Sequence, residues 1–153
     1  MELKPRDPHY EAKVRDSFSR QPFMTLLGAE MTALEPGLCE IRAAFREDLT
    51  QQHGFFHAGV TGAIVDSACG YAAFSLMEAD CSVLTVEYKL NLTAPADGTE
   101  LRARAQVTRP GKTLMVVTGE VFVNRDGVEK LCAVSLSTIM AMKGMADKKS
   151  DLA

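Results

Sequence analysis

The stretch that decides the fold is AGVTGAIVDSACGYAAFSLM, residues 58–77, which is almost wholly apolar. Asp66, near its centre, is its only charged residue, so no face of a helix built from it suits open water. The length would suit a membrane span, but a carboxylate at the bilayer centre costs about 2.5–3.5 kcal/mol. Gly59, Gly62 and Gly70 favour close packing against other protein. We therefore expect a buried helix that other parts of the chain enclose.

The segments on either side of this helix alternate between apolar and polar residues, the period of half-buried strands. Two short strands are expected before it, over 28–34 and 38–46, and a polar loop over 47–56 leads into the helix. Turns rich in Pro, Gly and Asp separate the later strands, so these run mostly antiparallel. Four longer strands are expected after the helix, over residues 85–92, 101–107, 113–123 and 129–141. A curved antiparallel sheet wrapped around one central helix gives the helix its cover, which predicts an α+β fold.

In the first strand after the helix, the apolar members of the alternation are Val86, Tyr88, Leu90 and Leu92. The chain as a whole divides into three parts. Residues 1–24 form a helical or extended segment, residues 25–142 the α+β domain, and residues 143–153 a polar tail. A short helix is expected over residues 11–20, ending near Pro22, with apolar anchors at Phe18, Phe23, Leu26 and Leu27.

The overall composition excludes several classes of protein. Among 153 residues, 46% are apolar and 24% are charged, the proportions of an ordinary globular domain. The net charge is −3 and no Lys/Arg block occurs, so nucleic acid is not an expected partner. The start has no apolar core of a secretory signal, and the four cysteines form no C-x-x-C pair. We expect a cytoplasmic protein with buried, reduced thiols, no metal site and no membrane partner.

Asp66 is the most informative residue for chemistry, because a carboxylate in an apolar helix is costly unless it is paired or open to a cleft. One interpretation is structural, with Asp66 bonded to a nearby hydroxyl such as Ser67 or to backbone donors. The other is catalytic, with a carboxylate that attacks a carbonyl or activates water. Both interpretations fit the pattern of residues.

The junction between loop and helix, His57-Ala58-Gly59, is a second candidate. The first N–H groups of a helix have no internal partner and carry the positive end of its dipole. Aimed at a thioester carbonyl, these groups would stabilise the oxyanion that forms on attack. An ordinary loop-to-helix junction would have the same sequence features.

These features together carry a resemblance to a known family. The segment QQHGFFHAG, residues 51–59, followed by Asp66, resembles the active-site region of hot-dog thioesterases of the phenylacetate-pathway (PaaI) type. That family's pattern is N-x-x-G-x-x-H-G-G, with an acidic residue nine positions after the His. Gly54, His57, Gly59 and Asp66 match it, whereas Gln51 and Ala58 replace the Asn and the first Gly. The stretch TVEYKLNLTAPA and the turn RPGKTL are also similar, and the similarity spans residues 25–141.

The resemblance implies a hot-dog fold and hydrolysis of an acyl- or aryl-CoA thioester to the free acid and CoA, with no cofactor. Asp66 would be the nucleophile or general base, and the N–H groups near Ala58 and Gly59 would polarise the thioester oxygen. His57 would shape the loop, and Thr85 would orient the attacking water. The implied catalytic set is Asp66, His57, Ala58, Gly59, Gln51 and Thr85.

The resemblance also implies contacts to CoA, through Gly54, Phe56, Arg109, Gly111, Lys112 and Thr113. Arg109 and Lys112 would meet phosphates as charge partners, although Pro-Gly turns with exposed cations occur in many hairpins. The implied assembly is a homodimer, or a homotetramer made of two dimers. In it, Asp66 and Thr85 of one subunit would face Gln51, His57 and Ala58 of the other.

Two rival functions are a hot-dog enoyl-CoA hydratase and a module that binds acyl-CoA without turnover. The hydratase type places a His five residues after the Asp, and this chain has Tyr71 there. The binding module is often attached to a DNA-binding segment, and residues 1–25 are too short and too acidic to form one. We therefore favour the thioesterase.

Overall fold

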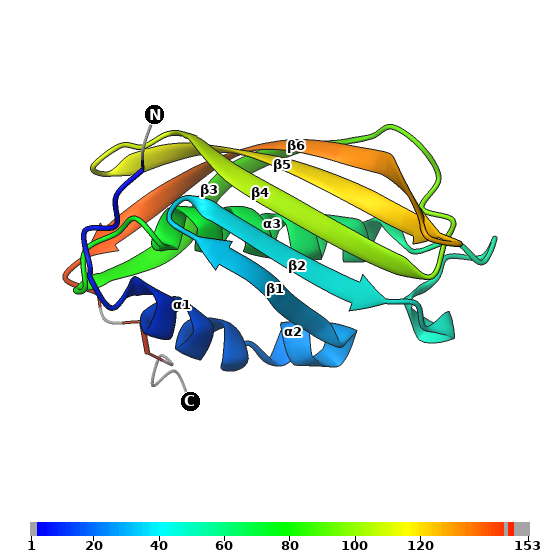
Figure 1. Ribbon diagram of the computed structural model, residues 1–153, viewed down its shortest axis with the longest axis horizontal. Coiled ribbons are helices and arrows are strands. Elements are labelled where there is room, and N and C mark those ends of the chain that lie inside the picture. Colours follow the sequence, from blue (N-terminus) through cyan, green and yellow to red (C-terminus); the bar gives the residue numbers. More distant parts are fainter. Residues whose placement is uncertain (1–2, 146, 149–153) are drawn as a thin grey trace.

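The computed structural model, which describes residues 3–145 and 147–148, has one curved antiparallel sheet wrapped around a central helix (Figure 1). The sheet has six strands in the order β1-β2-β4-β5-β6-β3. This is the predicted α+β arrangement. Of the predicted polar tail, residues 146 and 149–153 lie outside the described residues.

The elements, in chain order, are α1 (Tyr10–Ser19), α2 (Pro22–Leu27), β1 (Ala29–Glu35), β2 (Leu38–Ala44), the 3-10 turn η1 (Glu47–Leu49), α3 (Ala58–Phe74), β3 (Cys81–Leu92), β4 (Glu100–Arg109), β5 (Leu114–Arg125) and β6 (Val128–Lys143).

The central helix, α3, is enclosed as its composition predicts, with most of its residues buried against the concave face of the sheet. It ends at Phe74, before the predicted end at residue 77. Ser75 lies just past that end, where its hydroxyl donates to the Ala72 carbonyl at 2.6 Å and accepts from the Gly37 N–H at 2.7 Å. These bonds tie the end of α3 to the turn between β1 and β2. Among the described residues, no helix has the length and apolar character needed to cross a membrane.

Close approach between α3 and the sheet depends on a glycine in β5. A Cβ atom at Gly119 would lie 2.5 Å from Cγ2 of Val65 and 3.1 Å from Sγ of Cys69, both on α3. The absence of a side chain here therefore sets the spacing between the two layers.

The N-terminal part of the chain contains one helix more than predicted. The predicted helix over 11–20 is present as α1, but Pro22 begins a second helix, α2, instead of only ending the first. Proline suits the first helical position because its missing N–H would have no partner there. Leu27 is buried as expected, whereas Phe23 and Leu26 are 53% and 64% exposed, so these two are not core anchors within this chain.

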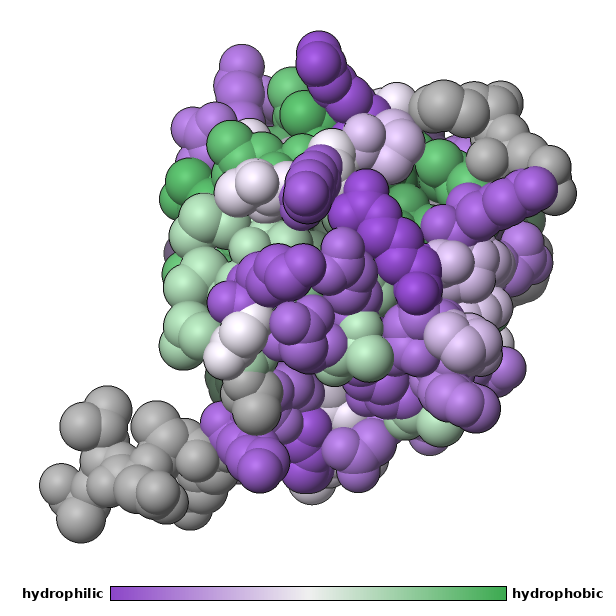
Figure 2. Space-filling view, turned by 90° about the vertical axis from the view of Figure 1, so that its left-hand side faces the viewer, coloured by the Kyte–Doolittle hydropathy of each residue, from purple (hydrophilic) through white to green (hydrophobic). Residues whose placement is uncertain are grey.

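Strand β3 lies at an edge of the sheet, with one of its long sides unpaired. A register shift between Thr85 and Glu87 removes Val86 from the predicted alternation. Tyr88 and Leu90 point towards α3, because a Cβ atom at Gly62 would lie 3.6 Å from a side-chain atom of each. The large apolar residues exposed on this strand are Leu84, Val86, Tyr88 and Leu92. Figure 2, which faces the end of the molecule where β3 begins, shows hydrophobic residues gathered along one side and hydrophilic residues over most of the rest.

Candidate active site

His57 caps the N-terminus of α3. The cap determines which backbone N–H groups of the first helical turn are free to bind a ligand. The Gly59 N–H donates to Nδ1 of His57 at 2.8 Å, and the Val60 N–H donates to the His57 carbonyl at 3.0 Å. Among the described residues, none accepts a hydrogen bond from the Ala58 N–H. The expectation that Ala58 and Gly59 both present free donors is therefore wrong for Gly59. One donor, the Ala58 N–H, stays free at the positive end of the helix dipole.

The same cap fixes the orientation and tautomer of His57. Because Nδ1 accepts the Gly59 N–H, a neutral imidazole carries its proton on Nε2. A Cβ atom at Gly59 would lie 2.9 Å from Nδ1, so glycine leaves the room that this hydrogen bond needs. His57 is exposed, and its Nε2–H can donate to a ligand at the mouth of the site.

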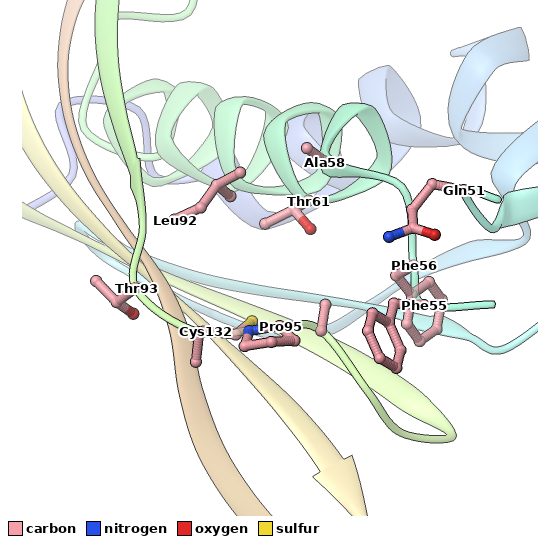
Figure 3. A pocket seen from close by; sticks show the side chains of 11 residues that line it. Gln51, Phe55, Phe56, Ala58, Thr61, Leu92, Thr93, Pro95 and Cys132 are labelled. Carbon is pink, nitrogen blue, oxygen red and sulfur yellow. The ribbon is translucent and has the colours of Figure 1, made fainter. Parts of the chain in front are cut away.

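The loop before α3 is a tight turn that holds Gln51 near the start of the helix. The Gln51 N–H donates to the Phe55 carbonyl, and the Gly54 N–H donates to the Gln51 carbonyl, both at 2.9 Å. Gly54 has φ +82°, which favours glycine. The Gln51 side-chain oxygen accepts from the His53 N–H. The amide nitrogen of Gln51 stays available and points into a pocket (Figure 3).

That pocket, about 550 Å³ in volume, opens between the start of α3 and the end of β3 (Figure 3). Thr61 lies on its helix side and is only 1% exposed. Within the described part of the chain, the Thr61 hydroxyl makes no hydrogen bond, and its oxygen is not among the buried atoms. It points into the pocket in Figure 3. The full lining is Gln51, Phe55, Phe56, Ala58, Thr61, Leu92, Thr93, Ala94, Pro95, Ala96 and Cys132.

Thr61 was not among the candidates from sequence, because a threonine in an apolar helix carries no signal of its own. Phe56 is buried and packs edge-on against Phe45, with ring centroids 5.5 Å apart. It therefore has a structural contact in addition to lining the pocket.

Asp66 lies halfway along α3 and is bonded to the neighbouring strand. Oγ1 of Thr85, on β3, donates to Oδ1 of Asp66 at 2.9 Å. Burial raises the pKa of Asp66 above its ordinary value, and the hydrogen bond from Thr85 offsets part of that rise. The structure thus brings Asp66 and Thr85 together, and the hydroxyl partner of Asp66 is Thr85 instead of Ser67.

A cavity of about 110 Å³ surrounds the Asp66 carboxylate. Its wall includes Gln21, from the junction between α1 and α2, and Tyr71, five residues further along α3. Nε2 of Gln21 donates to the Tyr71 hydroxyl at 2.8 Å, and Ser17 lies 3.3 Å from the same hydroxyl. Gln21 was missed from sequence because nothing in the local pattern links position 21 to position 66.

Asp66 and Ala58 of one chain do not meet at one thioester. They are eight residues apart on the same helix, a rise of about 12 Å. One thioester joins an N–H donor and a directly attacking oxygen that are roughly 7 Å apart, allowing about 3 Å for each contact. A base that acts through a water molecule lies about 3 Å further away. The two residues also line separate cavities. Within one chain, the start of α3 and the surroundings of Asp66 are therefore two separate places.

The hairpin between β4 and β5, predicted to contact CoA, lies near the end of α3 that is opposite Ala58 (Figure 1). The Val107 N–H donates to Gly37, which is itself bonded to Ser75 at that end. The Gly111 carbonyl accepts from Arg6 at 3.2 Å. Arg109, Lys112 and Thr113 are exposed, so they are accessible to a ligand but do not approach Ala58 of the same chain.

All four cysteines are buried free thiols, as expected from their apolar neighbours. Among the described residues, the one cluster with metal-ligand spacing is Glu78, Asp80 and Cys81, whose ligand atoms lie within 4.8 Å of one another. Glu78 is already paired with Lys143 at 2.6 Å. This cluster lies beyond the end of α3, away from Ala58, and adds nothing to the site.

Comparisons with known proteins identify the family and the fold of this chain. The family described as Thioesterase superfamily matches residues 53–130, a span that includes the start of α3 and Asp66. A solved thioesterase family protein from Silicibacter pomeroyi is 51% identical, with a TM-score of 0.87 over 88% of this chain and 99% of that one. A 1,4-dihydroxy-2-naphthoyl-CoA hydrolase from Listeria monocytogenes is 27% identical over 117 residues, covering 76% of this chain and 93% of the relative.

The PaaI protein of Escherichia coli shares the fold, with a TM-score of 0.78 at 17% identity over 92% of this chain and 98% of that one. The predicted hot-dog architecture is confirmed by these structures, and the predicted family by the match over residues 53–130. The chain belongs to the thioesterase superfamily, and it is a thioester hydrolase with the hot-dog fold.

Proposed function

We propose that this enzyme hydrolyses an acyl- or aryl-CoA thioester, with Asp66 as nucleophile or general base and the Ala58 N–H as the oxyanion donor. The observation that carries the proposal is the state of Asp66. It is the only carboxylate on α3, burial raises its pKa, and its hydrogen-bond partner is a single hydroxyl, that of Thr85. A structural aspartate in an apolar helix would be expected to have more of its oxygens satisfied.

Two forms of the chemistry use the same residue. As a general base, Asp66 removes a proton from water while the water oxygen bonds to the thioester carbon. The oxyanion then collapses, the C–S bond breaks, and the CoA thiolate takes the proton from Asp66. As a nucleophile, Asp66 displaces the thiolate and forms a mixed anhydride, which water hydrolyses to the acid and free Asp66. In both forms the Ala58 N–H holds the developing negative charge.

The proposed active unit is a dimer in which two β3 edges pair. A long edge strand with exposed apolar side chains is prone to pair with another chain unless it is covered. β3 has twelve residues, an unpaired side, and exposed Val86, Tyr88 and Leu92. Pairing there would set Asp66 and Thr85 of one copy against Gln51, His57 and Ala58 of the other. A tetramer made of two such dimers is compatible with this unit.

The proposed substrate is a CoA ester because the relative in Listeria monocytogenes is named as a CoA ester hydrolase and is similar over most of both chains. Gln51 would offer its amide nitrogen near the thioester, while Gly54 and Phe56 would shape the turn beside it. The exposed cations Arg109 and Lys112, with Gly111 and Thr113 of the same hairpin, would contact CoA phosphates of the neighbouring copy's substrate.

The test is release of free thiol from a panel of acyl- and aryl-CoA esters by the wild type and by Asp66→Asn. The proposal predicts that Asp66→Asn lowers turnover by about 10²-fold or more, the scale of losing a general base, with the fold intact. Asp126→Asn is a matched control, because Asp126 lies at the exposed turn between β5 and β6. Binding of CoA esters by calorimetry without any turnover would overturn the proposal in favour of a non-catalytic binding module.

A further inference from the structure

A second pocket lies on the other side of the α3 N-terminus, between α2, η1 and the first turn of α3, with a volume of about 430 Å³. The proposed chemistry gives no role to the exposed apolar residues of its wall. Its lining is Phe23, Leu26, Leu27, Arg46, Asp48, Leu49, Thr50, His57, Gly59 and Val60. We call it the α2 pocket, and the pocket of Figure 3 the Gln51 pocket.

The apolar part of the α2 pocket has a buried floor and exposed walls. The buried floor consists of Leu27, Leu49 and Val60. The side chains of Phe23 and Leu26, on the short helix α2, are exposed to solvent. Two large apolar side chains exposed side by side around a hollow suit an apolar ligand, because covering them removes apolar surface from water.

The charged groups at this pocket are already paired with each other. Arg46 donates from Nε to Oδ1 of Asp48 and from Nη2 to Oδ2 of Asp48, each at 3.0 Å. Nη2 also donates to the Leu26 carbonyl at 3.0 Å, which fastens α2 to the loop before η1. Because these charges satisfy one another, the pocket suits an uncharged group better than a phosphate.

The two pockets lie on either side of the proposed oxyanion donor. Ala58 lines the Gln51 pocket, whereas His57 and Gly59, on either side of it in sequence, line the α2 pocket. A thioester whose oxygen is bound to the Ala58 N–H has two substituents, the acyl group and the sulfur of the CoA arm. The pockets offer each substituent a separate place.

Two hydrogen-bonding groups inside the Gln51 pocket indicate which substituent goes where. The pocket presents the Gln51 amide nitrogen and the Thr61 hydroxyl, which makes no hydrogen bond to another described residue and points into the pocket (Figure 3). The pantetheine arm of CoA contains amides, which need hydrogen-bond partners, whereas an acyl chain has none to offer. We infer that the α2 pocket receives the acyl or aryl group, that Phe23 and Leu26 set its permitted size, and that Thr61 contacts the pantetheine arm. This rests on the proposed function.

The test compares kcat/KM on octanoyl-CoA and acetyl-CoA for Leu26→Trp and Thr61→Val. Filling the α2 pocket with Leu26→Trp is expected to lower kcat/KM on octanoyl-CoA by at least about 10-fold and to leave acetyl-CoA nearly unchanged. Thr61→Val is expected to lower both to a similar degree, because both esters carry the same pantetheine arm. Val128→Trp, at an exposed apolar position outside the lining of the pocket, is the matched control for adding an indole.

Equal effects of Leu26→Trp on the two esters, or none, would overturn the inference. So would dissociation of the oligomer by Leu26→Trp on size-exclusion chromatography with light scattering, which would make α2 an interface. Calorimetry in the Asp66→Asn background compares the affinities for octanoyl-CoA and acetyl-CoA with and without Leu26→Trp. It measures binding to the pocket in the absence of turnover. If no ester is hydrolysed but Leu26→Trp selectively weakens octanoyl-CoA binding, the proposed function fails while this inference holds.

Discussion

Oγ1 of Thr85 donates a hydrogen bond of 2.9 Å to Oδ1 of Asp66, which joins the edge strand β3 to the middle of the central helix. A hydrogen-bond donor to a carboxylate favours the ionised form. Burial raises the pKa of Asp66, and the hydrogen bond from Thr85 lowers it. The bond therefore links the position of the edge strand to the protonation of the proposed catalytic group.

Replacing Thr85 by valine should move the acidic limb of the pH–rate profile to higher pH. Without the hydroxyl, burial acts unopposed and the pKa of Asp66 rises further, so a smaller fraction of the enzyme is ionised at a given acidic pH. The kcat/KM of Thr85→Val and of Thr85→Ser, measured across pH, checks this. Thr85→Ser keeps the donor and should keep the wild-type limb. Identical limbs in the wild type and Thr85→Val would contradict the link.

Asp66→Asn should be more stable than the wild type at neutral pH, although the proposed function predicts that it loses turnover. The pKa of Asp66 is raised in the folded state, so its contribution to stability is present below its ordinary pKa of 3.8 and is lost as pH rises through the folded value. The asparagine side chain of the variant does not ionise, so the variant does not lose this stability as pH rises. Thermal unfolding from pH 4 to pH 8 should show the variant gaining stability over the wild type as pH rises. A difference that is constant across pH would show that ionisation is not the cause.

Ala58→Pro should abolish turnover while leaving α3 in place. Proline removes the N–H but is well tolerated at the first helical position, and His57, at φ −65° and ψ 139°, already has the conformation required before a proline. The expected loss in kcat is about 10²-fold or more, the scale of losing an oxyanion donor. Ala58→Gly keeps the N–H and should stay within a few-fold of the wild type. Circular dichroism verifies the fold, and an active Ala58→Pro enzyme would assign the oxyanion to another donor.

The close packing of α3 against the sheet predicts opposite effects on stability for two glycine-to-alanine substitutions. Gly119→Ala places a methyl group against Val65 and Cys69, and overpacking of this kind costs about 1–3 kcal/mol. A methyl group at Gly70, inside α3, meets no atom within 4 Å apart from the helix itself, so Gly70→Ala should stabilise by about 0.5–1 kcal/mol. Chemical denaturation measures both. Equal effects of the two variants would mean that contact between helix and sheet does not set the spacing.

Much of the fold could be predicted from the sequence because its elements have strong local signals. An apolar helix with one charge must be enclosed, and the alternation in the flanking segments supplies the sheet. The helix α2 was not predicted because its six residues are too few to show a period. The exposure of Val86 and Tyr88 was not predictable from alternation either, because a pattern says which side chains share a face but not whether another chain covers it.

The candidate site could be predicted in part for the same kind of reason. Asp66 and Ala58 stand in one continuous motif, and a single stretch of sequence identifies both. The capping of Gly59 by His57 depends on a side-chain rotamer, which no pattern encodes. Gln21 approaches Asp66 only through the packing of a distant segment. Contacts of this type become visible when the tertiary structure is known.

The most direct test of the central claim, a site shared between two copies, is complementation between Asp66→Asn and Ala58→Pro. The two variants are co-refolded from denaturant in equal amounts, and free-thiol release from a CoA ester is measured before and after mixing. In a mixed dimer, one site combines the intact Ala58 of one chain with the intact Asp66 of the other. Half of randomly assembled dimers are mixed and each has one complete site, so activity should return to about a quarter of the wild-type value. A mixture that stays as inactive as its parts, although mass spectrometry finds mixed dimers, would contradict the shared site.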